Sequence, residues 1–590
     1  MSKVSRVLNI NVGILGHVDS GKTSLVAALS THLSTAALDK HPQSKERGIT
    51  LDLGFSSFSA GPLPPHLSHL PYDELQFTLV DCPGHASLIR TIIGGVHIID
   101  MIVLVIDVTK GLQAQTAECL VVGEVTTPHM LIALNKVDML PSESRSKSIR
   151  KAAKALLQTL RYTKFSAAPM VPVAAKPGSS KSSNGYASST EVPGTLASAS
   201  AALGIEDLKS QLVAMVPPVP RNVEGPFLLS VDHCFAIKGQ GTVMTGTVMR
   251  GSVAVGDIVE LPALKIQRPV RSMQAFKRPV TKAVQGDRVG VCVTQLDPGL
   301  MERGLAATPG SVPTFLAAVA SVEKIRFYAG PVMSGSKLHI SVGHETVMAT
   351  VSFFGMKPGE GIPGHLAVQA LMDSMEQLAV GGRPPPLQLQ KEYLHQEELH
   401  GLEGRPTSST NANKGYGQFS APDSEVAEGR HHGPQWALLR FDHAVTAPQE
   451  SLLIGARLDA DIHGESCRLC FYGRLLWLLD PSSMNELSKL KVYKVKERQG
   501  SIERMQPDGI TAICKGLFKK ETDISVFAGL KVHTTSGQEG VIEGSFGKSG
   551  KFKVTFGSGF TLESGSEEKH IFLRFKRFIN DPDRKTKPRQ

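Results

Sequence analysis

A short apolar run, Val7–Leu15, leads directly into the octapeptide Gly16–Thr23, and a helix-like segment, Ser24–His32, follows it. The octapeptide fits the pattern G-x-x-x-x-G-K-[ST], whose glycines let the main chain wrap its N–H groups around phosphates. In such a loop the lysine, here Lys22, reaches the β- and γ-phosphates, and the hydroxyl of Thr23 ligates Mg²⁺. The strand–loop–helix context therefore predicts a nucleotide-phosphate site. Its candidate residues are Gly16, Asp19, Ser20, Gly21, Lys22 and Thr23.

From residue 4 to about residue 219, short strands rich in Val, Ile and Leu alternate with longer helical patterns. This alternation is typical of an α/β domain with a doubly wound parallel sheet. Two stretches, the proline-rich 61–71 and the Ser/Ala/Gly-rich 177–200, are predicted to be surface loops. The clearest predicted strands are Phe77–Val80, Met101–Asp107, Met130–Asn135 and Met170–Val173.

After the proline-rich residues 217–220 the pattern changes to short strands separated by glycines, which favours small β-barrels. A chain of 590 residues is also too long for a single hydrophobic core. We therefore predict four domains: the α/β domain at 1–219, a β-barrel at 220–308, a second barrel at 309–480 with a disordered polar insert at about 384–433, and a mostly β domain at 481–590.

Most of the chain's net charge of +10 lies in this last domain. Residues 481–590 contain 21 Lys and Arg against 13 Asp and Glu, a net charge of +8. A basic terminal domain is typical of contact with nucleic acid, although a merely soluble basic surface is the alternative. Over Ile571–Ile579 basic residues alternate with phenylalanines, which fits a half-buried strand and also an RNA-stacking surface; we favour the strand.

The seven cysteines are scattered and odd in number, which indicates a reducing compartment without a disulfide framework. Cys467 and Cys470 form a C-x-x-C pair, for which buried strand cysteines are favoured over a zinc or redox site. The sequence has neither a signal peptide nor an apolar stretch long enough to span a membrane, so we expect a cytoplasmic protein without a membrane segment. The basic residues Arg584, Lys585 and Lys587 could also direct it to the nucleus.

Two further elements follow predicted strands and identify the nucleotide. Asp81 closes the strand at 77–80, where a carboxylate can hold Mg²⁺ through water, and the N–H of Gly84 can sense a γ-phosphate. Another strand ends in Asn135–Asp138, and the Asp carboxylate can accept both N1–H and the exocyclic amino group of guanine, whereas adenine has no such donor pair. The α/β domain is therefore expected to bind GTP through Asn135, Lys136 and Asp138.

Two loops complete this site. Arg47–Thr50 lies between the phosphate loop and Asp81, and Thr50 is the candidate second hydroxyl on Mg²⁺, on a loop that orders when the γ-phosphate is present. The base-side loop follows the strand at 170–173, and there Ala174 replaces the commoner serine of Ser-Ala-Lys, so that one side-chain hydrogen bond is lost while backbone contact to the base remains. The residues of this loop are Ala174, Ala175 and Lys176.

Together these motifs resemble those of translational GTPases of the elongation factor Tu class. The continuation Ala86–Gly95 and the stretches Val231–Phe235 and Gly239–Val243 are similar to eukaryotic selenocysteine-specific elongation factors, over essentially the whole chain. The resemblance implies a G domain, two barrels and a carboxyl-terminal domain, with GTP/GDP and Mg²⁺ as ligands. It also implies a monomeric GTPase that delivers selenocysteinyl-tRNA to the ribosome at in-frame UGA codons and communicates with the selenocysteine insertion RNA element and its binding protein.

The same resemblance implies roles for catalytic residues. His85 matches the histidine that orients the water attacking the γ-phosphate, and Lys22 would neutralise the charge that develops. Mg²⁺ would be held by Thr23, by Thr50 and, through water, by Asp81.

Asp232, His233 and Arg288 match the family's aminoacyl pocket. A selenol is much more acidic than a hydroxyl, so cationic partners would favour a selenolate over the side chain of serine. The alternative is that Asp232 and Arg288 form a structural pair at a barrel rim.

Two other functions remain open at this point. A general elongation or initiation GTPase would carry ordinary aminoacyl-tRNA, and the appended basic domain together with Arg288 argues against it. A ribosome-associated RNA-binding scaffold would keep a hydrolytically silent G domain, and the presence of Thr50, Asp81 and His85 argues against that.

Overall fold

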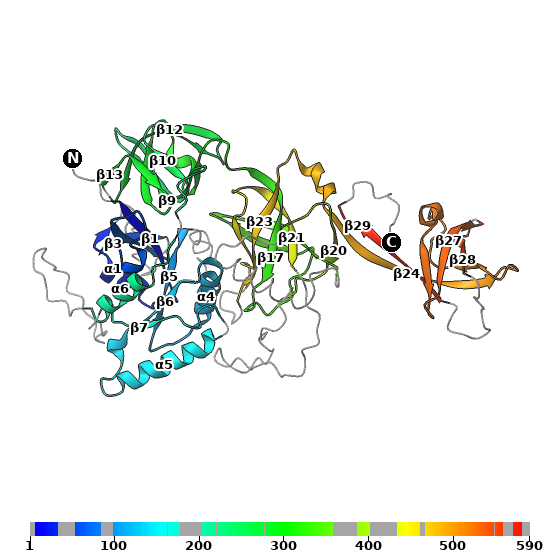
Figure 1. Ribbon diagram of the computed structural model, residues 1–590, viewed down its shortest axis with the longest axis horizontal. Coiled ribbons are helices and arrows are strands. Elements are labelled where there is room, and N and C mark those ends of the chain that lie inside the picture. Colours follow the sequence, from blue (N-terminus) through cyan, green and yellow to red (C-terminus); the bar gives the residue numbers. More distant parts are fainter. Residues whose placement is uncertain are drawn as a thin grey trace, which may run out of the picture.

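The computed structural model describes residues 6–33, 53–83, 98–161, 163–176, 202–219, 221–276, 278–357, 386–401, 434–460, 467–547, 549–557 and 570–580. Figure 1 shows a sheet with helices beside a first barrel, a second barrel next to both, and a last group of strands at the far end. None of the helices in these ranges is long and apolar enough to cross a membrane.

The first sheet has seven strands in the order β2-β3-β4-β1-β5-β6-β7. Its neighbours from β4 to β7 are parallel, whereas β3 is antiparallel to both β4 and β2. The sheet is therefore mixed and not wholly parallel as predicted, because residues 63–73 between β3 and β4 hold only the short 3₁₀-helix Pro65–Leu67 and no crossover helix. The strands are β1 Val7–Leu15, β2 His32–Leu33, β3 Gly54–Pro62, β4 Glu74–Asp81, β5 Met101–Asp107, β6 Met130–Asn135 and β7 Met170–Pro172.

Helices cover both faces of this sheet, as the doubly wound prediction requires. Alternate residues of β5 point to opposite faces, with Val103 on one side and Leu104 on the other. The face with Val103 packs against α1 (Lys22–Leu29) and α6 (Ile205–Ala214), and the other packs against α4 (Ala114–Thr126) and α5 (Arg145–Leu160).

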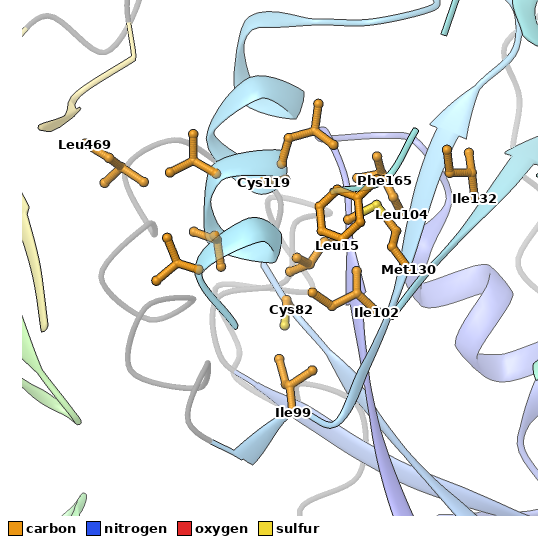
Figure 2. Packing of buried hydrophobic residues seen from close by; sticks show 14 of the residues in the cluster. Leu15, Cys82, Ile99, Ile102, Leu104, Cys119, Met130, Ile132, Phe165 and Leu469 are labelled. Carbon is orange, nitrogen blue, oxygen red and sulfur yellow. The ribbon is translucent and has the colours of Figure 1, made fainter. Parts of the chain in front are cut away.

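Helix α4 also joins the sheet to the second barrel. Figure 2 shows Leu469 of that barrel on the side of α4 that faces away from the sheet, and Leu469 belongs to the same buried cluster as Cys119 and Leu104. At the edge of this cluster the carboxylate of Glu118 accepts two hydrogen bonds of 2.9 Å from the guanidinium of Arg468, and both side chains are buried. The contact between α4 and the second barrel thus combines apolar packing with a buried ion pair.

The first barrel contains a sheet in the order β11-β16-β8-β9-β15-β12-β13, closed by pairing of β11 with β12. A separate ribbon of β10 and β14 lies beside it. Its core is a cluster of valine, leucine and methionine side chains from alternate strand positions. The strands are β8 Leu228–Ile237, β9 Gly241–Arg250, β10 Ser252–Ala254, β11 Ile258–Leu261, β12 Ile266–Ala275, β13 Arg278–Val280, β14 Lys282–Val284, β15 Arg288–Val293 and β16 Gly304–Ala307.

The remaining strands form one continuous sheet, in the order β18-β22-β23-β17-β21-β19-β20-β24-β25-β28-β27-β26-β29. Pairing of β18 with β19 closes the second barrel, and pairing of β24 with β29 closes the terminal group. The strands are β17 Thr314–Lys324, β18 Lys337–Val342, β19 Glu345–Gly355, β20 Glu392–Gln396, β21 Gln435–Thr446, β22 Leu452–Ala456, β23 Leu469–Leu479, β24 Lys491–Met505, β25 Thr511–Lys515, β26 Lys531–Thr534, β27 Glu539–Phe546, β28 Lys551–Phe556 and β29 His570–Phe578.

Strand β20 lies inside the stretch 384–433 that the sequence predicted to be a disordered insert, so that prediction is wrong for these residues. The strand connects β19 of the second barrel with β24 of the terminal group. Its Tyr393 is buried against the rings of Phe354 and Trp436, with centroids 5.4 and 5.2 Å away. The aromatic packing and the backbone pairing on both sides explain why a polar stretch is ordered here.

Strand β29 confirms the half-buried strand predicted at residues 571–579. Its buried face carries Ile571, Leu573 and Phe575, whereas Phe572 lies on the opposite face together with the exposed Arg574. The period of two in a strand thus divides the phenylalanines between the two faces.

Candidate functional site

The phosphate loop leaves β1 at Gly16 and enters α1 at Gly21. Both glycines have left-handed backbone angles, with φ of +150° and +92°. A Cβ atom at Gly16 would lie 2.4 Å from the carbonyl oxygen of Val105, and one at Gly21 would lie 2.3 Å from Nδ2 of Asn135. The tight packing around the loop therefore requires glycine at both positions for space as well as for conformation.

Two side chains of the loop are already held in place. Lys22 is buried and its Nζ donates a 2.8 Å hydrogen bond to the carbonyl of His17, so that the ammonium lies across the loop. Burial lowers the pKa of Lys22 from its ordinary value. Thr23 Oγ1 donates a 2.7 Å hydrogen bond to Oδ2 of Asp81 at the end of β4. A hydroxyl and a carboxylate so close together at the end of a phosphate loop are hard oxygen donors that fit Mg²⁺.

Asn135 connects the phosphate loop to the base-side loop. Its Nδ2 donates to the carbonyl of Ser20 at 2.9 Å, and its Oδ1 accepts from the backbone N–H of Ala175 at 3.2 Å. The Ala175 N–H therefore donates to a side chain of this site, and the predicted backbone contact of the loop to the base stays a prediction, while Ala174 forms a β-bridge with Leu203. One amide therefore fixes the two loops relative to each other.

Lys136 and Asp138 follow at the carboxyl end of β6. Lys136 has a left-handed φ of +66°, and its Nζ lies 2.8 Å from Oδ2 of Asp107, the last residue of β5. Burial raises the pKa of the Asp107 carboxyl, but hydrogen bonds from Lys136 and Thr109 outweigh burial and the net pKa is lowered. Asp138 lies in the 3₁₀-helix Val137–Met139. The sequence analysis missed Asp107, although its position at a strand end was a usable signal.

Three residues predicted for hydrolysis and γ-phosphate sensing, Thr50, Gly84 and His85, lie outside the described residues. Their assigned roles stay predictions. Lys176 lies within the described part, at the end of the base-side loop.

A second constellation, here called the Arg288 pocket, is formed by Asp232, His233 and Arg288 in the first barrel. The sequence predicted this set, and the structure brings its members together. Asp232 is buried in β8 and accepts from Nη1 of Arg288, the first residue of β15. It also accepts a 2.8 Å hydrogen bond from Thr245 Oγ1 and lies 3.2 Å from Nδ1 of His233. Burial alone would raise the pKa of Asp232, but the charge of Arg288 outweighs it and holds that pKa far below its usual range.

Arg288 also lines a cavity of about 80 Å³ between β8, β9, β12 and β15. Nη2 of its guanidinium is buried and has no hydrogen-bond partner among the described residues. A buried charged donor without a partner is costly, so this atom is a candidate contact for a ligand. The cavity is lined by Phe235, Ile237, Gln240, Val243, Thr245, Ser272, Gln274, Phe276, Arg288, Val289, Gly290 and Cys292.

The C-x-x-C pair has the structural role favoured from the sequence. Cys467 and Cys470 are both buried, and burial raises their pKa values to about 12 and about 11, respectively. Such thiols stay protonated and unreactive at neutral pH. Within the described part of the chain, no group of His, Cys, Asp and Glu side chains is arranged to hold a metal ion.

Comparison with known proteins agrees with this geometry. Three family models match: the elongation factor Tu GTP binding domain at residues 8–218, the third domain of eukaryotic selenocysteine-specific elongation factor at 319–473, and the eEFSec C-terminal RIFT domain at 488–570. The fold and the nucleotide site thus define a translational GTPase of the elongation factor Tu type.

Individual relatives are more specific. The chain is 49% identical to a selenocysteine-specific elongation factor from Mus musculus, over 95% of this chain and 90% of the relative. It is 34% identical to one from Methanocaldococcus jannaschii, over 58% of this chain and 66% of the relative. The chain therefore belongs to the family of selenocysteine-specific elongation factors.

Among solved structures, elongation factor SelB from Methanococcus maripaludis in complex with the GTP analogue GppNHp shares the fold. Its TM-score is 0.63 at 22% identity, and the match covers 97% of this chain and 99% of that one. This likeness supports the predicted fold class, an α/β GTPase domain followed by β-barrels and a mostly β terminal domain.

Proposed function

We propose that this GTPase binds selenocysteinyl-tRNA while it holds GTP, delivers it to the ribosome at in-frame UGA codons, and releases it when GTP is hydrolysed. The observation that carries the proposal is the Arg288 pocket, where Arg288 lines a cavity of the first barrel and its buried Nη2 has no hydrogen-bond partner among the described residues. The family membership makes an aminoacylated tRNA the natural ligand of that barrel.

The pocket distinguishes selenocysteine from serine by the charge of the side chain. A selenocysteine side chain is ionised at neutral pH, and a selenolate can accept a charge-assisted hydrogen bond from Nη2 of Arg288. The hydroxyl of serine is neutral and offers Nη2 no charge-assisted hydrogen bond in return for its desolvation. Asp232 contacts Arg288 through Oδ2 and His233 through Oδ1, so it orients both side chains without contacting the selenium itself.

Hydrolysis at the nucleotide site depends on positioning and charge stabilisation. Lys22 neutralises charge on the β- and γ-phosphates, and Asp138 selects guanine. Thr23, Thr50 and Asp81 would hold Mg²⁺, which would neutralise charge on the phosphate oxygens. His85 orients the attacking water, with the ribosome as activator.

The terminal domain contacts RNA, and its partners include the selenocysteine insertion RNA element and its binding protein. Support comes from basic side chains at the surface of this domain, although acidic neighbours compensate several others, such as Lys494 beside Glu397 and Lys551 beside Glu503. Phosphate contacts need an excess of positive charge. The exposed basic residues include Lys491, Lys496, Lys519, Lys520 and Arg577.

Filter binding of selenocysteinyl-, seryl- and cysteinyl-tRNA to the GTP-bound protein tests the proposal. We expect selenocysteinyl-tRNA to bind at least about a hundredfold more tightly than seryl-tRNA, since rejection by an unpaired buried polar group reaches this size. Arg288→Ala should remove the preference and leave GTP affinity unchanged. Equal binding of all three tRNAs would favour a general elongation factor. Tight tRNA binding without ribosome-stimulated GTP turnover would favour the scaffold.

A further inference from the structure

The guanidinium of Arg288 lies over a ring that belongs to another part of the molecule. Its Cζ is 3.2 Å from the ring centroid of Phe55, the second residue of β3 in the GTPase sheet. Phe55 is completely buried, and the side chain of Arg288 is 4% exposed. The contact between the two domains is therefore a desolvated cation–π stack, the setting in which such stacks are strongest.

This stack leaves the guanidinium little freedom. Nη1 is held by Asp232, Cζ lies over the ring of Phe55, and Nη2 has no hydrogen-bond partner among the described residues. An arginine side chain has several rotatable bonds, and one ion pair at Nη1 does not fix the plane of the group. The ring therefore determines the direction in which Nη2 donates.

The backbone before Arg288 is also held by the GTPase domain. The carbonyl of Gly286 accepts hydrogen bonds from Nδ2 of Asn9 and Nδ2 of Asn11 in β1, at 2.8 and 3.0 Å. Arg221 contacts the same strand through the carbonyl of Asn9, at 2.6 Å. Residues of the GTPase domain thus contact both the turn before β15, through Asn9 and Asn11, and the side chain of Arg288, through Phe55.

Phe55 is close to the nucleotide site along its own strand. In the register of β3 with β4, Phe55 pairs with Val80, and the preceding Gly54 pairs with Asp81, whose carboxylate accepts from Thr23. Phe55 is therefore the sequence neighbour of Gly54, which pairs with Asp81, a predicted Mg²⁺ contact.

We propose that Phe55 is a positioning residue for the Arg288 pocket: by stacking under the guanidinium it aims Nη2 and so sets the preference for a selenolate over a hydroxyl. This inference rests on the proposed function of the pocket. It adds a residue from the GTPase domain to a set of pocket residues that the sequence resemblance places in the barrel alone.

The test compares variants of the full chain in the GTP-bound state, with the ratio of selenocysteinyl- to seryl-tRNA affinity as the readout. Phe55→Leu keeps an apolar side chain and removes the π face. We expect it to lower the ratio about thirtyfold, the size of a desolvated cation–π contact of about 2 kcal/mol. The matched control is Phe58→Leu, the same substitution in the same strand, where the ring stacks on Phe77 at 4.9 Å. Phe58→Leu should change the ratio less than about twofold.

A second variant allows the role of Phe55 to be tested even if Phe55→Leu folds poorly. Replacing Phe55 with a trifluorinated phenylalanine preserves the ring's shape and weakens its negative face. This change should lower the ratio in the same direction, which a purely structural role for the ring would not do. An unchanged ratio in this variant would overturn the inference.

Arg288→Ala separates the two possible failures. If it lowers the ratio and the Phe55 variants do not, the pocket is assigned correctly and the positioning role of Phe55 is wrong. If Arg288→Ala leaves the ratio unchanged, the proposed function of the pocket is itself wrong. If both are right, the double variant Phe55→Leu/Arg288→Ala should be no worse than Arg288→Ala alone, because the ring acts through the arginine.

Discussion

The phosphate loop takes its backbone from consecutive residues, Gly16–Thr23, whereas the Arg288 pocket takes its side chains from three strands in two domains. In the loop, Lys22 contacts His17 only a few residues away, and the loop is braced by Asn135 of the same sheet. In the pocket, Arg288 depends on Asp232 of the barrel and on Phe55 of the GTPase sheet.

This difference between the phosphate loop and the Arg288 pocket predicts how each site responds to amino-acid substitutions. Nucleotide binding should depend on the local conformation of the loop and on one sheet, so it should survive changes at the contact between domains. The pocket should depend on that contact, which is largely polar around Gly286 and Arg221. Polar contacts between domains are easier to perturb by single substitutions than a packed core.

The largest expected effect is local to the loop. Gly21→Ala should lower GTP affinity at least about a hundredfold, because φ of +92° is strained for alanine and the new Cβ would displace the Asn135 amide. Gly111→Ala is the control, since that glycine also has a positive φ of +67° but has open space around it. Titration with a fluorescent guanine nucleotide measures both. Wild-type affinity in Gly21→Ala would show that the loop can adjust.

Specificity for the base should be nearly as sensitive. Asp138→Asn should lower GTP affinity about a hundredfold, because the two charge-assisted hydrogen bonds to guanine are lost. It should improve binding of xanthosine triphosphate, whose carbonyl at the amino position can accept from the new amide. Glu143→Gln neutralises an exposed carboxylate nearby and serves as the control. Equal GTP binding by Asp138→Asn and Glu143→Gln would exclude Asp138 from base recognition.

The third prediction concerns the contact between the GTPase domain and the first barrel. Arg221 donates to Asp100 at 3.0 and 2.8 Å, and both side chains are largely buried. Arg221→Met should destabilise the domain pair by about 3 kcal/mol, because it leaves a buried carboxylate without its partner. We expect selenocysteinyl-tRNA binding to weaken while GTP affinity holds. The control is Arg6→Met, since Arg6 is 61% exposed beside Asp73. Chemical denaturation and filter binding report the two effects, and a parallel loss of GTP affinity would contradict the comparison.

The smallest effect concerns pH. Burial raises the pKa of Asp287 to about 6 from a reference value of 3.8. The folded chain therefore retains a proton that the unfolded chain releases between about pH 4 and 6, so stability falls as pH rises through this window. Asp287→Asn should remove this slope and add about 1 to 2 kcal/mol at pH 7. Asp257→Asn is the control, because Asp257 makes a similar turn contact at an exposed position. Identical pH profiles for wild type and Asp287→Asn would contradict the prediction.

The regular elements could be predicted from the sequence where the pattern is local. The expected strands Met101–Asp107 and Met130–Asn135 are present with the same bounds, because continuous apolar runs mark buried parallel strands. The antiparallel edge formed by β3 was missed, since strand direction depends on pairing and not on composition. Strand β20 was missed for the same reason, because its order comes from β19 and β24.

The candidate sites divide in the same way. The motif residues Lys22, Asn135 and Asp138 could be found from spacing alone, and the set Asp232, His233 and Arg288 from resemblance. Asp107 was missed although it ends a predicted strand, and Phe55 could not be found, because its partner Arg288 is distant in the sequence.

The sequence by itself determined the nucleotide chemistry of this elongation factor, because a phosphate loop and the carboxylate predicted to bind guanine act through short segments whose conformation is encoded locally. Only the tertiary structure decided which groups surround Arg288, since a guanidinium takes its direction from whatever packs on its face and edges. The sequence therefore specified the nucleotide that the GTPase domain binds. The fold decided how the Arg288 pocket contacts that domain, through the ring of Phe55.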